Sequence, residues 1–355
     1  MIRLTELDAL MCGVDTPLSQ VLARIDSSPY LFQIVVDSER RLLGTITDGD
    51  IRRAMLHGSS LDTPAGQCMF PTPRYGRVGA DRENARLLET LGSTIPFLPL
   101  LDGDGRVVEI LYGRSNRTIE TALVMAGGLG TRLGERTKTT PKPLLPVGGR
   151  PILDHVLTNL EQAGVRRIFV SVNYLAEQIE DFLARRLSIA QTIPLREQKR
   201  LGTAGALDLL PDEQKGRPVL VVNGDLLTRV DIGALCEFHH RHALDATVAV
   251  TPHHVEIPFG VVRYGPDGLF AGIEEKPRIS HFIAAGIYYL TPPLTALVRP
   301  GEPTDMPEVL NRAREIGLKI GLFPIHEYWV DVGRPDDLDA ADRLHSSAAP
   351  PGDAK

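Results

Sequence analysis

The sequence predicts an α/β protein: a doubly wound, mostly parallel sheet preceded by a smaller α+β domain. Two observations support this fold class. From residue 121 onward, apolar strand-like runs alternate with segments of helical period, which is typical of βαβ units. Earlier in the chain, one strand–turn–strand pattern occurs twice. We therefore expect a first domain over residues 1–116, a second over 120–345 and a flexible tail over 346–355.

The first domain contains an internal repeat. Residues 28–55 have the pattern of strand, turn, strand and helix, with the turn at Asp37–Arg40. Residues 95–112 repeat the first part of this pattern, with the turn at Asp102–Gly105. Two copies of one unit predict a pseudo-twofold pair. The segment Gly44–Arg53, GTITDGDIRR, resembles the end of the first repeat in a tandem CBS (cystathionine-β-synthase) pair.

In CBS pairs a Thr/Ser-x-x-Asp element holds the ribose of an adenine nucleotide. The resemblance therefore implies that Thr47 and Asp50 bind a regulatory adenine nucleotide. The second copy ends without this threonine and aspartate, so at most one such clamp is present. An alternative stays open, in which Asp50 only caps a helix and the pair serves as a spacer or in oligomerisation. We also expect a homo-oligomer.

The second domain begins with a candidate phosphate-binding loop. The apolar run Ala122–Met125 stops at closely spaced glycines, where backbone N–H groups can surround an anion. These are Gly127, Gly128 and Gly130. Two cations, Arg132 and Lys142, follow. A P-loop would need Gly-Lys-Ser/Thr, and a dinucleotide fingerprint would need a third spaced glycine, so neither motif is present. The loop predicts a polyphosphate ligand.

The remaining elements of the second domain follow from hydrophobic period. We expect helices at Leu153–Ala163 and Leu175–Arg186, and strands at Val165–Val172 and Pro218–Val222. A further helix should open at Asp305–Glu308, because Pro307 suits a first turn. Ligands of such sheets bind beyond the carboxyl ends of the strands, where the glycine loop lies.

The segment from residue 121 to 153 resembles the signature of the sugar-1-phosphate nucleotidyltransferases, L-x-A-G-G-x-G-T-R-L followed by P-K-P. The resemblance implies a Rossmann-like enzyme that joins a nucleoside triphosphate to a sugar 1-phosphate and releases pyrophosphate. It implies catalytic roles for Arg132, Lys142 and Lys276. The implied nucleotide-binding residues of the loop are Ala126, Gly127, Gly128, Gly130 and Thr131.

Two aspartates are candidate ligands of Mg²⁺. Asp225 ends the apolar run that starts at Val219, and Asp331 ends the short run from Tyr328. One or two carboxylates plus substrate phosphates are sufficient to hold Mg²⁺. An aspartate after a strand is more often a helix cap. Both aspartates stand within motifs that carry the metal in the resembled family, and we therefore predict a magnesium site.

Four further residues are implied to bind the sugar phosphate. Lys276 and Glu275 belong to an E-E-K-P motif, Gly260 to F-G-V-V and Gly286 to A-A-G-I-Y. The family usually has Asn at the position of Ala284. One polar contact to the sugar is therefore missing, which leaves the sugar open.

Glu197 is the candidate residue for recognising the nucleobase. Its carboxylate only accepts hydrogen bonds, and guanine presents two adjacent donors, whereas thymine and uracil present one donor between carbonyls. This favours GTP. Gly202 and Thr203, in an L-G-T-A-G turn, are implied to bind nucleotide as in mannose-type guanylyltransferases. The alternatives are a dTTP- or UTP-dependent glucose-1-phosphate enzyme, and a Glu197 that points to solvent or pairs with Lys199 or Arg200. The resemblance to guanylyltransferases that carry an N-terminal CBS pair implies a hexosamine 1-phosphate as the sugar substrate.

Composition excludes several other classes. The formal charge of −6 shows no basic footprint for nucleic acid, and no long apolar run suits a membrane. Three cysteines without C-x-x-C spacing fit a cytoplasmic protein. A group of histidines matches no zinc pattern, and we expect them at the surface or at helix ends. These are His239, His240, His242, His253 and His254.

Two other function classes fit the sequence less well. A nucleotide-sensing CBS regulatory protein would carry a degenerate second domain, but the cations and carboxylates named above are intact. A dinucleotide-dependent oxidoreductase is disfavoured by the missing fingerprint.

Overall fold

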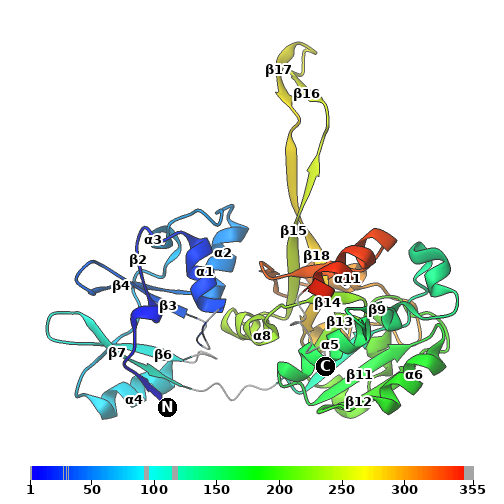
Figure 1. The fold of residues 1–355 in the computed structure, drawn as a ribbon, viewed down its shortest axis with the longest axis horizontal. Coiled ribbons are helices and arrows are strands. Elements are labelled where there is room, and N and C mark those ends of the chain that lie inside the picture. Colours follow the sequence, from blue (N-terminus) through cyan, green and yellow to red (C-terminus); the bar gives the residue numbers. More distant parts are fainter. Residues whose placement is uncertain are drawn as a thin grey trace, which may run out of the picture.

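The computed structural model describes residues 2–26, 28, 30, 32–91, 96–113 and 119–347. Two domains lie side by side, and helix α8 of the second domain faces the first (Figure 1). The predicted boundary between residues 116 and 120 and most of the predicted tail lie outside the described residues. Among the residues that are described, no helix is both long and apolar enough to cross a membrane.

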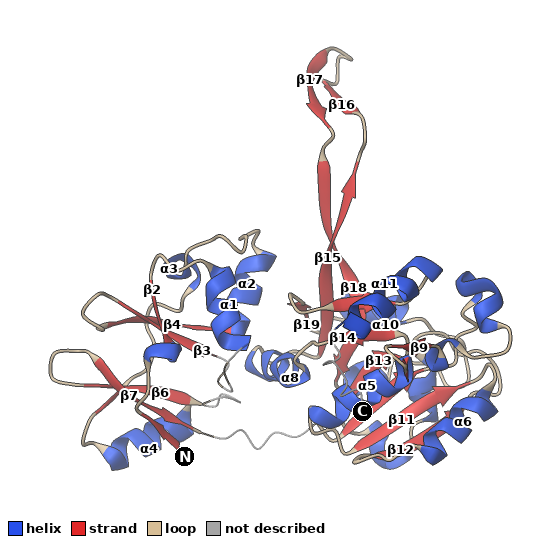
Figure 2. Cartoon of the chain, in the orientation of Figure 1, coloured by secondary structure: helices blue, strands red, loops and turns tan. Residues whose placement is uncertain are grey.

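A seven-stranded mixed sheet forms the second domain, in the order β12-β11-β8-β13-β18-β15-β19 (Figure 2). Neighbours among the first four strands are parallel, as are β15 and β19, whereas β18 is antiparallel to both of its neighbours. The predicted mostly parallel α/β fold is therefore confirmed. The strands are β8 (Thr121–Met125), β11 (Arg167–Val172), β12 (Gln191–Arg196), β13 (Val219–Asn223), β15 (Ala246–Glu256), β18 (Arg278–Leu290) and β19 (Ile320–Pro324).

Helices cover both faces of this sheet. Ala122 and Val124 belong to the core on one face and Leu123 to the core on the other, and all three are fully buried. Burial on both faces explains why the strand is continuously apolar in the sequence. The helices are α5 (Ile152–Gln162), α6 (Ala176–Arg185), α7 (Asp212–Lys215), α8 (Ile232–Arg241), α9 (Pro292–Thr295), α10 (Met306–Glu315) and α11 (Pro335–Ser347). The predicted helices near residues 153, 175 and 305 are thus present.

The first domain is a pseudo-twofold pair, as predicted. Asp37 and Asp102 each accept backbone N–H groups from two and four residues ahead, at 2.8–2.9 Å. The rings of Phe32 and Phe97, at matching positions of the two copies, stack with centroids 3.9 Å apart. The sheets are β2-β3-β4 and β1-β7-β6-β5. Their strands are β1 (Ile2–Leu4), β2 (Met11–Gly13), β3 (Phe32–Val36), β4 (Leu42–Thr47), β5 (Gly76–Arg77), β6 (Phe97–Leu101) and β7 (Val107–Tyr112). Helices α1 (Leu18–Asp26), α2 (Asp48–Leu56), α3 (Ala65–Cys68) and α4 (Asp81–Thr90) complete it.

A long arm projects from the second domain (Figure 1). Strands β15 and β18 stay paired beyond the sheet, out to the pair Glu256 and Arg278, and carry the hairpin of β16 (Gly260–Tyr264) and β17 (Phe270–Glu275). Many large apolar side chains of the arm are exposed, among them Phe259 and Phe270. Because exposed apolar surface of this extent is rare on monomers, the arm has the character of an interaction surface.

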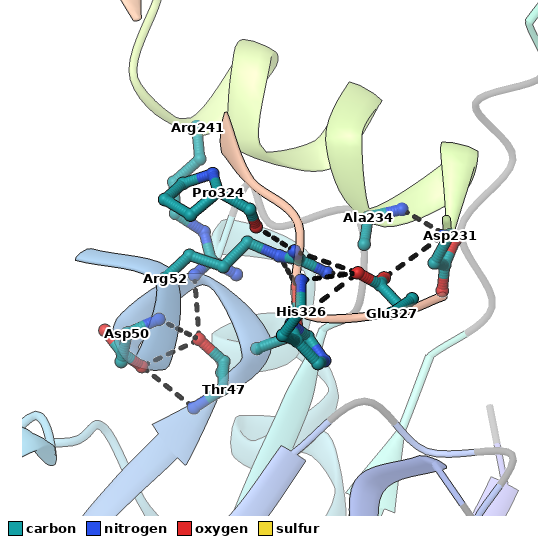
Figure 3. Close-up of polar contacts among 10 residues, drawn as sticks. Thr47, Asp50, Arg52, Asp231, Ala234, Arg241, Pro324, His326 and Glu327 are labelled. Carbon is teal, nitrogen blue, oxygen red and sulfur yellow. Dashed lines mark hydrogen bonds and ion pairs between the residues drawn. The ribbon is translucent and has the colours of Figure 1, made fainter. Parts of the chain in front are cut away.

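A buried arginine joins the two domains (Figure 3). Arg52 of α2 is fully buried. Its guanidinium contacts Asp48 at 2.5 Å, Glu327 at 2.8 Å and the carbonyl oxygen of Pro324, and it lies 3.8 Å from the ring centroid of Phe323. Burial alone would raise the pKa of Glu327, but the charge and hydrogen bonds of Arg52 lower that pKa to about 2. Glu327 is therefore ionised at neutral pH and forms an ion pair with Arg52 across the interface.

We predict that Arg52→Met lowers the free energy of unfolding by about 3–5 kcal/mol, because it leaves two buried carboxylates without their cation. Urea unfolding followed by the fluorescence of Trp329 measures this change. Trp329 is the only tryptophan of the chain, and it follows Glu327 by two residues. The matched control is Arg312→Met, which removes a more exposed (i, i+4) pair with Glu308 and should cost less than about 1 kcal/mol. Equal effects of the two changes would contradict the prediction.

Candidate functional site

The glycine loop follows β8 directly and folds back on itself. Gly130 has φ +64°, and a Cβ at this position would lie 2.9 Å from Thr137 and 3.0 Å from Lys142. The hydroxyl of Thr137 donates to the carbonyl of Gly130 at 3.0 Å. Thr131 then begins a 3-10 segment, η2 (Thr131–Thr137). Only glycine fits this tight turn, which brings the loop against the side chains of Thr137 and Lys142.

The loop shares its surroundings with the ends of two other strands. Ala126 is buried, and its N–H donates to Ser171 of β11 at 3.0 Å. A Cβ on Gly224 would lie 2.8 Å from the carbonyl of Met125, so a glycine is needed for β8 and β13 to end this close together. By contrast, a Cβ on Gly128 would meet no atom within 4 Å. This face of the loop is therefore open to a ligand.

Lys142 lies between the two predicted metal ligands. Its ammonium nitrogen is 2.5 Å from Asp225 Oδ2 and 3.6 Å from Asp331 Oδ1. The aspartates meet because β14 (Leu226–Thr228) pairs antiparallel with β20 (Trp329–Asp331). Residues far apart in the sequence, Asp225 and Asp331, thus form one anionic pair around a buried cation.

This pair has the properties of a cation site. Burial, followed by the charge of Asp225, raises the pKa of Asp331. Among the described residues, Oδ1 of Asp225 is buried without a hydrogen-bond partner, and Oδ1 of Asp331 has only the 3.6 Å ion pair with Lys142. Such carboxylate oxygens fit Mg²⁺, which takes oxygen ligands and keeps further positions for phosphates and water. No cluster of three or more His, Cys, Asp or Glu side chains suited to a metal occurs within the described residues.

The side chain of Arg132 lies beside the pair of aspartates. A Cβ on Gly333 would lie 3.3 Å from a terminal nitrogen of Arg132, so the guanidinium packs over the backbone just after Asp331. The structure therefore brings together Arg132, Lys142 and both aspartates. This combination of cations and carboxylates, beside an open glycine loop, can neutralise the charge of a polyphosphate.

Glu197 borders the glycine loop and is buried. One carboxylate oxygen accepts the N–H of Leu201 at 2.9 Å, and the other accepts the hydroxyl of Ser171. A Cβ on Gly127 would lie 3.0 Å from this second oxygen. Glu197 therefore does not point to solvent, and among the described residues it forms no ion pair with Lys199 or Arg200, so that alternative is wrong. Recognition of the base by Glu197 stays a prediction.

Gly202 and Thr203 pack against the start of α10. Gly202 has φ +78°, and a Cβ there would lie 2.6 Å from the carbonyl of Thr304. The Thr203 hydroxyl donates to Asp305 at 3.2 Å and accepts the N–H of Met306 at 2.8 Å. These contacts fix the turn against the helix. Binding of nucleotide by the two residues stays a prediction.

The predicted sugar-phosphate residues are split between two places. Gly286 has φ +74° and lies under the amide of Asn223, at the end of β13. Gly260 and Glu275 instead face each other in the β16–β17 hairpin, and Lys276 follows with φ +46°. Strand β18 spans roughly 30 Å between its start at Arg278 and the residues that pair with β13. The structure thus does not bring Lys276 to Asp225.

Thr47 and Asp50 form a capping box at the start of α2. Asp50 Oδ2 accepts the N–H of Thr47 at 2.9 Å and its hydroxyl at 2.7 Å. Asp50 is therefore a helix cap, as one alternative held, and its use in ligand binding stays a prediction.

The expected position at a helix end holds for His239, which is in the last turn of α8. His239 is buried, its ring lies 3.0 Å from the Thr247 hydroxyl, and burial lowers its pKa to about 4. It faces the core because its position on α8 turns toward the sheet. His253 and His254 are exposed on the arm. The cysteines are free, as expected.

Two contributors to the site were missed. Asn223 covers Gly286, and Ser171 holds Glu197. The signal for Asn223 was its place in the N-G-D sequence that ends at Asp225; no sequence signal identified Ser171.

Comparisons with known proteins agree with this geometry. Residues 121–347 match the family described as nucleotidyl transferase, and residues 4–57 match the CBS domain. A mannose-1-phosphate guanylyltransferase catalytic subunit beta from Drosophila pseudoobscura pseudoobscura is 34% identical over 64% of this chain and 64% of its own length. A mannose-1-phosphate guanyltransferase from Schizosaccharomyces pombe is 33% identical over 61% of each. The chain therefore spans less than two thirds of these curated relatives.

Two solved structures resemble the second domain. HddC from Yersinia pseudotuberculosis has a TM-score of 0.51 and 25% identity over 63% of this chain and 99% of its own. A putative glucose-1-phosphate thymidylyltransferase from Bacillus anthracis has a TM-score of 0.53 and 25% identity, over 65% of this chain and 96% of its own. With the matched signature and the site above, these findings show that the chain belongs to the nucleotidyl transferase family and carries a CBS domain before its transferase domain.

Proposed function

We propose that the protein is a Mg²⁺-dependent sugar-1-phosphate nucleotidyltransferase that favours GTP. One observation carries the proposal: Lys142 lies between Asp225 and Asp331, next to an open glycine loop. The substrates are a nucleoside triphosphate and a hexose or hexosamine 1-phosphate, and the products are an NDP-sugar and pyrophosphate. The names of the relatives favour mannose 1-phosphate, and glucosamine 1-phosphate is the other candidate.

The site suits this reaction because both reactants are anions. The attacking phosphate oxygen is already ionised, so no general base is needed and catalysis is mainly alignment and charge neutralisation. Arg132 and Lys142 bind and orient the triphosphate. Bound Mg²⁺ supplies further positive charge, held by Asp225 and Asp331. The two aspartates also keep Lys142 oriented toward the loop.

Pyrophosphate release tests the proposal directly. The protein is mixed with each of the four common nucleoside triphosphates, each with mannose, glucosamine or glucose 1-phosphate. Release that requires both substrates and Mg²⁺, and is fastest with GTP, supports the proposal. Release only with dTTP or UTP and glucose 1-phosphate would replace it by the alternative activity. No release with any pair would leave the nucleotide-sensing CBS protein as the better description.

We predict that Asp225→Ala and Asp331→Ala each reduce Mg²⁺-dependent turnover at least about 1,000-fold, because the phosphate charge is then left uncompensated. Steady-state pyrophosphate release at several Mg²⁺ concentrations measures the loss. The control is Asp339→Ala, which removes an exposed partner of Arg136 and should leave turnover unchanged. Near-normal turnover of a folded Asp225→Ala variant would contradict the metal assignment.

We predict that Lys276→Ala raises the KM for the sugar phosphate or lowers kcat, with the KM for GTP unchanged. Its ammonium is proposed to bind the sugar phosphate, and a charge-assisted contact is worth about 1.5–3 kcal/mol, or about 10- to 100-fold. Arg263→Ala, on the same arm, is the control for a general effect of charge. Unaltered kinetics of the Lys276 variant would exclude this role.

The same variant reports on how the arm acts. We propose a homo-oligomer in which arms are covered, since the exposed apolar residues of the arm support it. If the arm serves the crevice of a second copy, a mixture of Lys276→Ala and Asp225→Ala proteins recovers activity that neither has alone. If each arm serves its own crevice, the mixture stays inactive.

We predict that Glu197→Gln lowers the ratio of kcat/KM for GTP over dTTP by about 10- to 100-fold, because an amide donor then faces a guanine donor. The control is Ser171→Ala, which removes an internal partner of Glu197 but keeps its carboxylate, and which should preserve the ratio. A wild-type protein that prefers dTTP, or a ratio that moves equally in both variants, would show that Glu197 does not read the base.

A further inference from the structure

Within one chain, the crevice formed by the glycine loop and the two aspartates lacks most of its predicted sugar-phosphate contacts. Gly286 lies under Asn223, at the end of β13. Gly260 and Glu275 pair in the hairpin that ends the arm, and Lys276 follows directly (Figure 1). The extended chain from Lys276 to Gly286 spans roughly 30 Å. A hexose 1-phosphate is much shorter than this, so it cannot contact both places in one chain.

The arm is a continuous hydrogen-bonded ribbon that leads away from the crevice (Figure 1). Residues 250–256 of β15 pair with residues 278–284 of β18 without a shift of register. The pairing continues beyond these strands, where the N–H of Ile257 donates to the carbonyl of Pro277 at 3.1 Å. To reach the crevice of its own chain, the ribbon would have to bend sharply and lose backbone hydrogen bonds. The arm is therefore built to reach outward.

The surface of the arm is strongly apolar. Ten of the twenty large apolar side chains that are exposed in the described part of the chain lie between residues 255 and 283. Phe259, Tyr264 and Phe270 are each at least 70% exposed. Clustered apolar surface of this kind marks a contact with another molecule, because its exposure to water is unfavourable. The arm thus needs a partner that covers it.

Lys276 is held in a backbone conformation that residues other than glycine rarely adopt. Its φ is +46°, in the left-handed region. The N–H of Lys276 donates to the carbonyl of Phe259 at 3.3 Å, so the hairpin maintains this conformation. Residues in such strained conformations cluster at functional sites. The arm therefore presents a fixed cation far from the crevice of its own chain.

We propose that two copies of this chain exchange arms, so that Gly260, Glu275 and Lys276 of each copy complete the crevice of the other. This inference rests on the proposed function, because it takes these residues as contacts of the sugar phosphate. A second copy fits as the partner because every copy has both an incomplete crevice and an arm without a crevice. A twofold arrangement completes both crevices and covers both arms at once.

The exchange makes the two substrates depend differently on assembly. The glycine loop, Lys142 and both aspartates belong to one chain, so triphosphate binding needs no partner. The sugar phosphate needs Lys276 of the second copy. Its affinity is therefore coupled to dimer formation, whereas the affinity for GTP is not.

Cross-linking tests the exchange without an activity assay. Asn223→Cys places a thiol in the crevice, and Lys276→Cys places one on the arm. Both proteins also carry Cys68→Ser, because Cys68 is the native cysteine that is not buried. The two proteins are produced together with different tags and treated with a short bis-maleimide. We expect a cross-linked heterodimer that carries both tags.

The same thiols distinguish exchange from an arm that serves its own chain. If each arm entered its own crevice, the doubly substituted Asn223→Cys, Lys276→Cys protein would form its cross-link within one chain, and the mixed proteins would form no heterodimer. Either result would overturn the proposal. Each single variant produced alone, with both tags, gives the background.

Sedimentation tests the apolar contact of the arm. We expect a dimer of the wild-type protein and a monomer of Phe270→Glu, whose exposed ring is not needed for folding. The matched control is Leu187→Glu, which changes an apolar side chain that is 98% exposed outside the arm and should leave the dimer intact. A monomeric wild-type protein, or a dimeric Phe270→Glu variant, would overturn the proposal.

Calorimetry of the same variants separates the two substrates. We expect Phe270→Glu to bind GTP as the wild-type protein does, and to bind mannose or glucosamine 1-phosphate at least about 10-fold more weakly. Equal weakening of both substrates would contradict the exchange. Sedimentation and cross-linking measure no turnover. A cross-linked dimer without pyrophosphate release would therefore refute the proposed function alone, and a monomer with full turnover would refute the exchange alone.

Discussion

The contact of Lys142 with two carboxylates is the interaction on which the candidate site depends. Asp225 directly precedes β14 and Asp331 ends β20, and because these two strands pair with each other, the two carboxylates lie close together. Without a cation between them, this pairing would be unfavourable. Lys142 supplies that cation, and its Cβ also limits the turn at Gly130. Loop shape and charge balance are thus set by the same residue.

Local sequence patterns predicted the parts of the fold that are determined locally. Burial on both faces made β8 continuously apolar, and amphipathic period located α5 and α6 to within a residue or two. The repeated Asp turns revealed the pseudo-twofold pair. Asp225 and Asp331 were predicted as a pair of ligands because each ends an apolar run within a motif; in the structure Asp331 ends β20, whereas Asp225 lies in the turn between β13 and β14. Their common contact with Lys142 depends on strand pairing over long sequence distances, which no local pattern contains.

Other features depend on tertiary contacts. A strand has the same period of two whether it lies in a sheet or in a projecting arm, so no local pattern indicates that Lys276 lies far from Asp225. The hydrogen-bond partners of Glu197 are Ser171, on the neighbouring strand β11, and Leu201, four residues after Glu197. The role of Arg52 was equally hidden. An arginine on a short helix is normally exposed to solvent. The burial of Arg52 requires the carboxylate of Glu327 from the other domain.

The buried Arg52 also limits how this protein can be divided or recombined. A chain cut between the domains would leave the transferase fragment with Glu327 and the Pro324 carbonyl facing water or an empty space. The CBS fragment would keep a guanidinium shaped for a partner that is gone. Grafting this CBS pair onto another nucleotidyl transferase therefore requires that Pro324–Glu327 and the start of α8 be transplanted with it. In this chain the boundary between the CBS and transferase domains passes through a single ionic cluster.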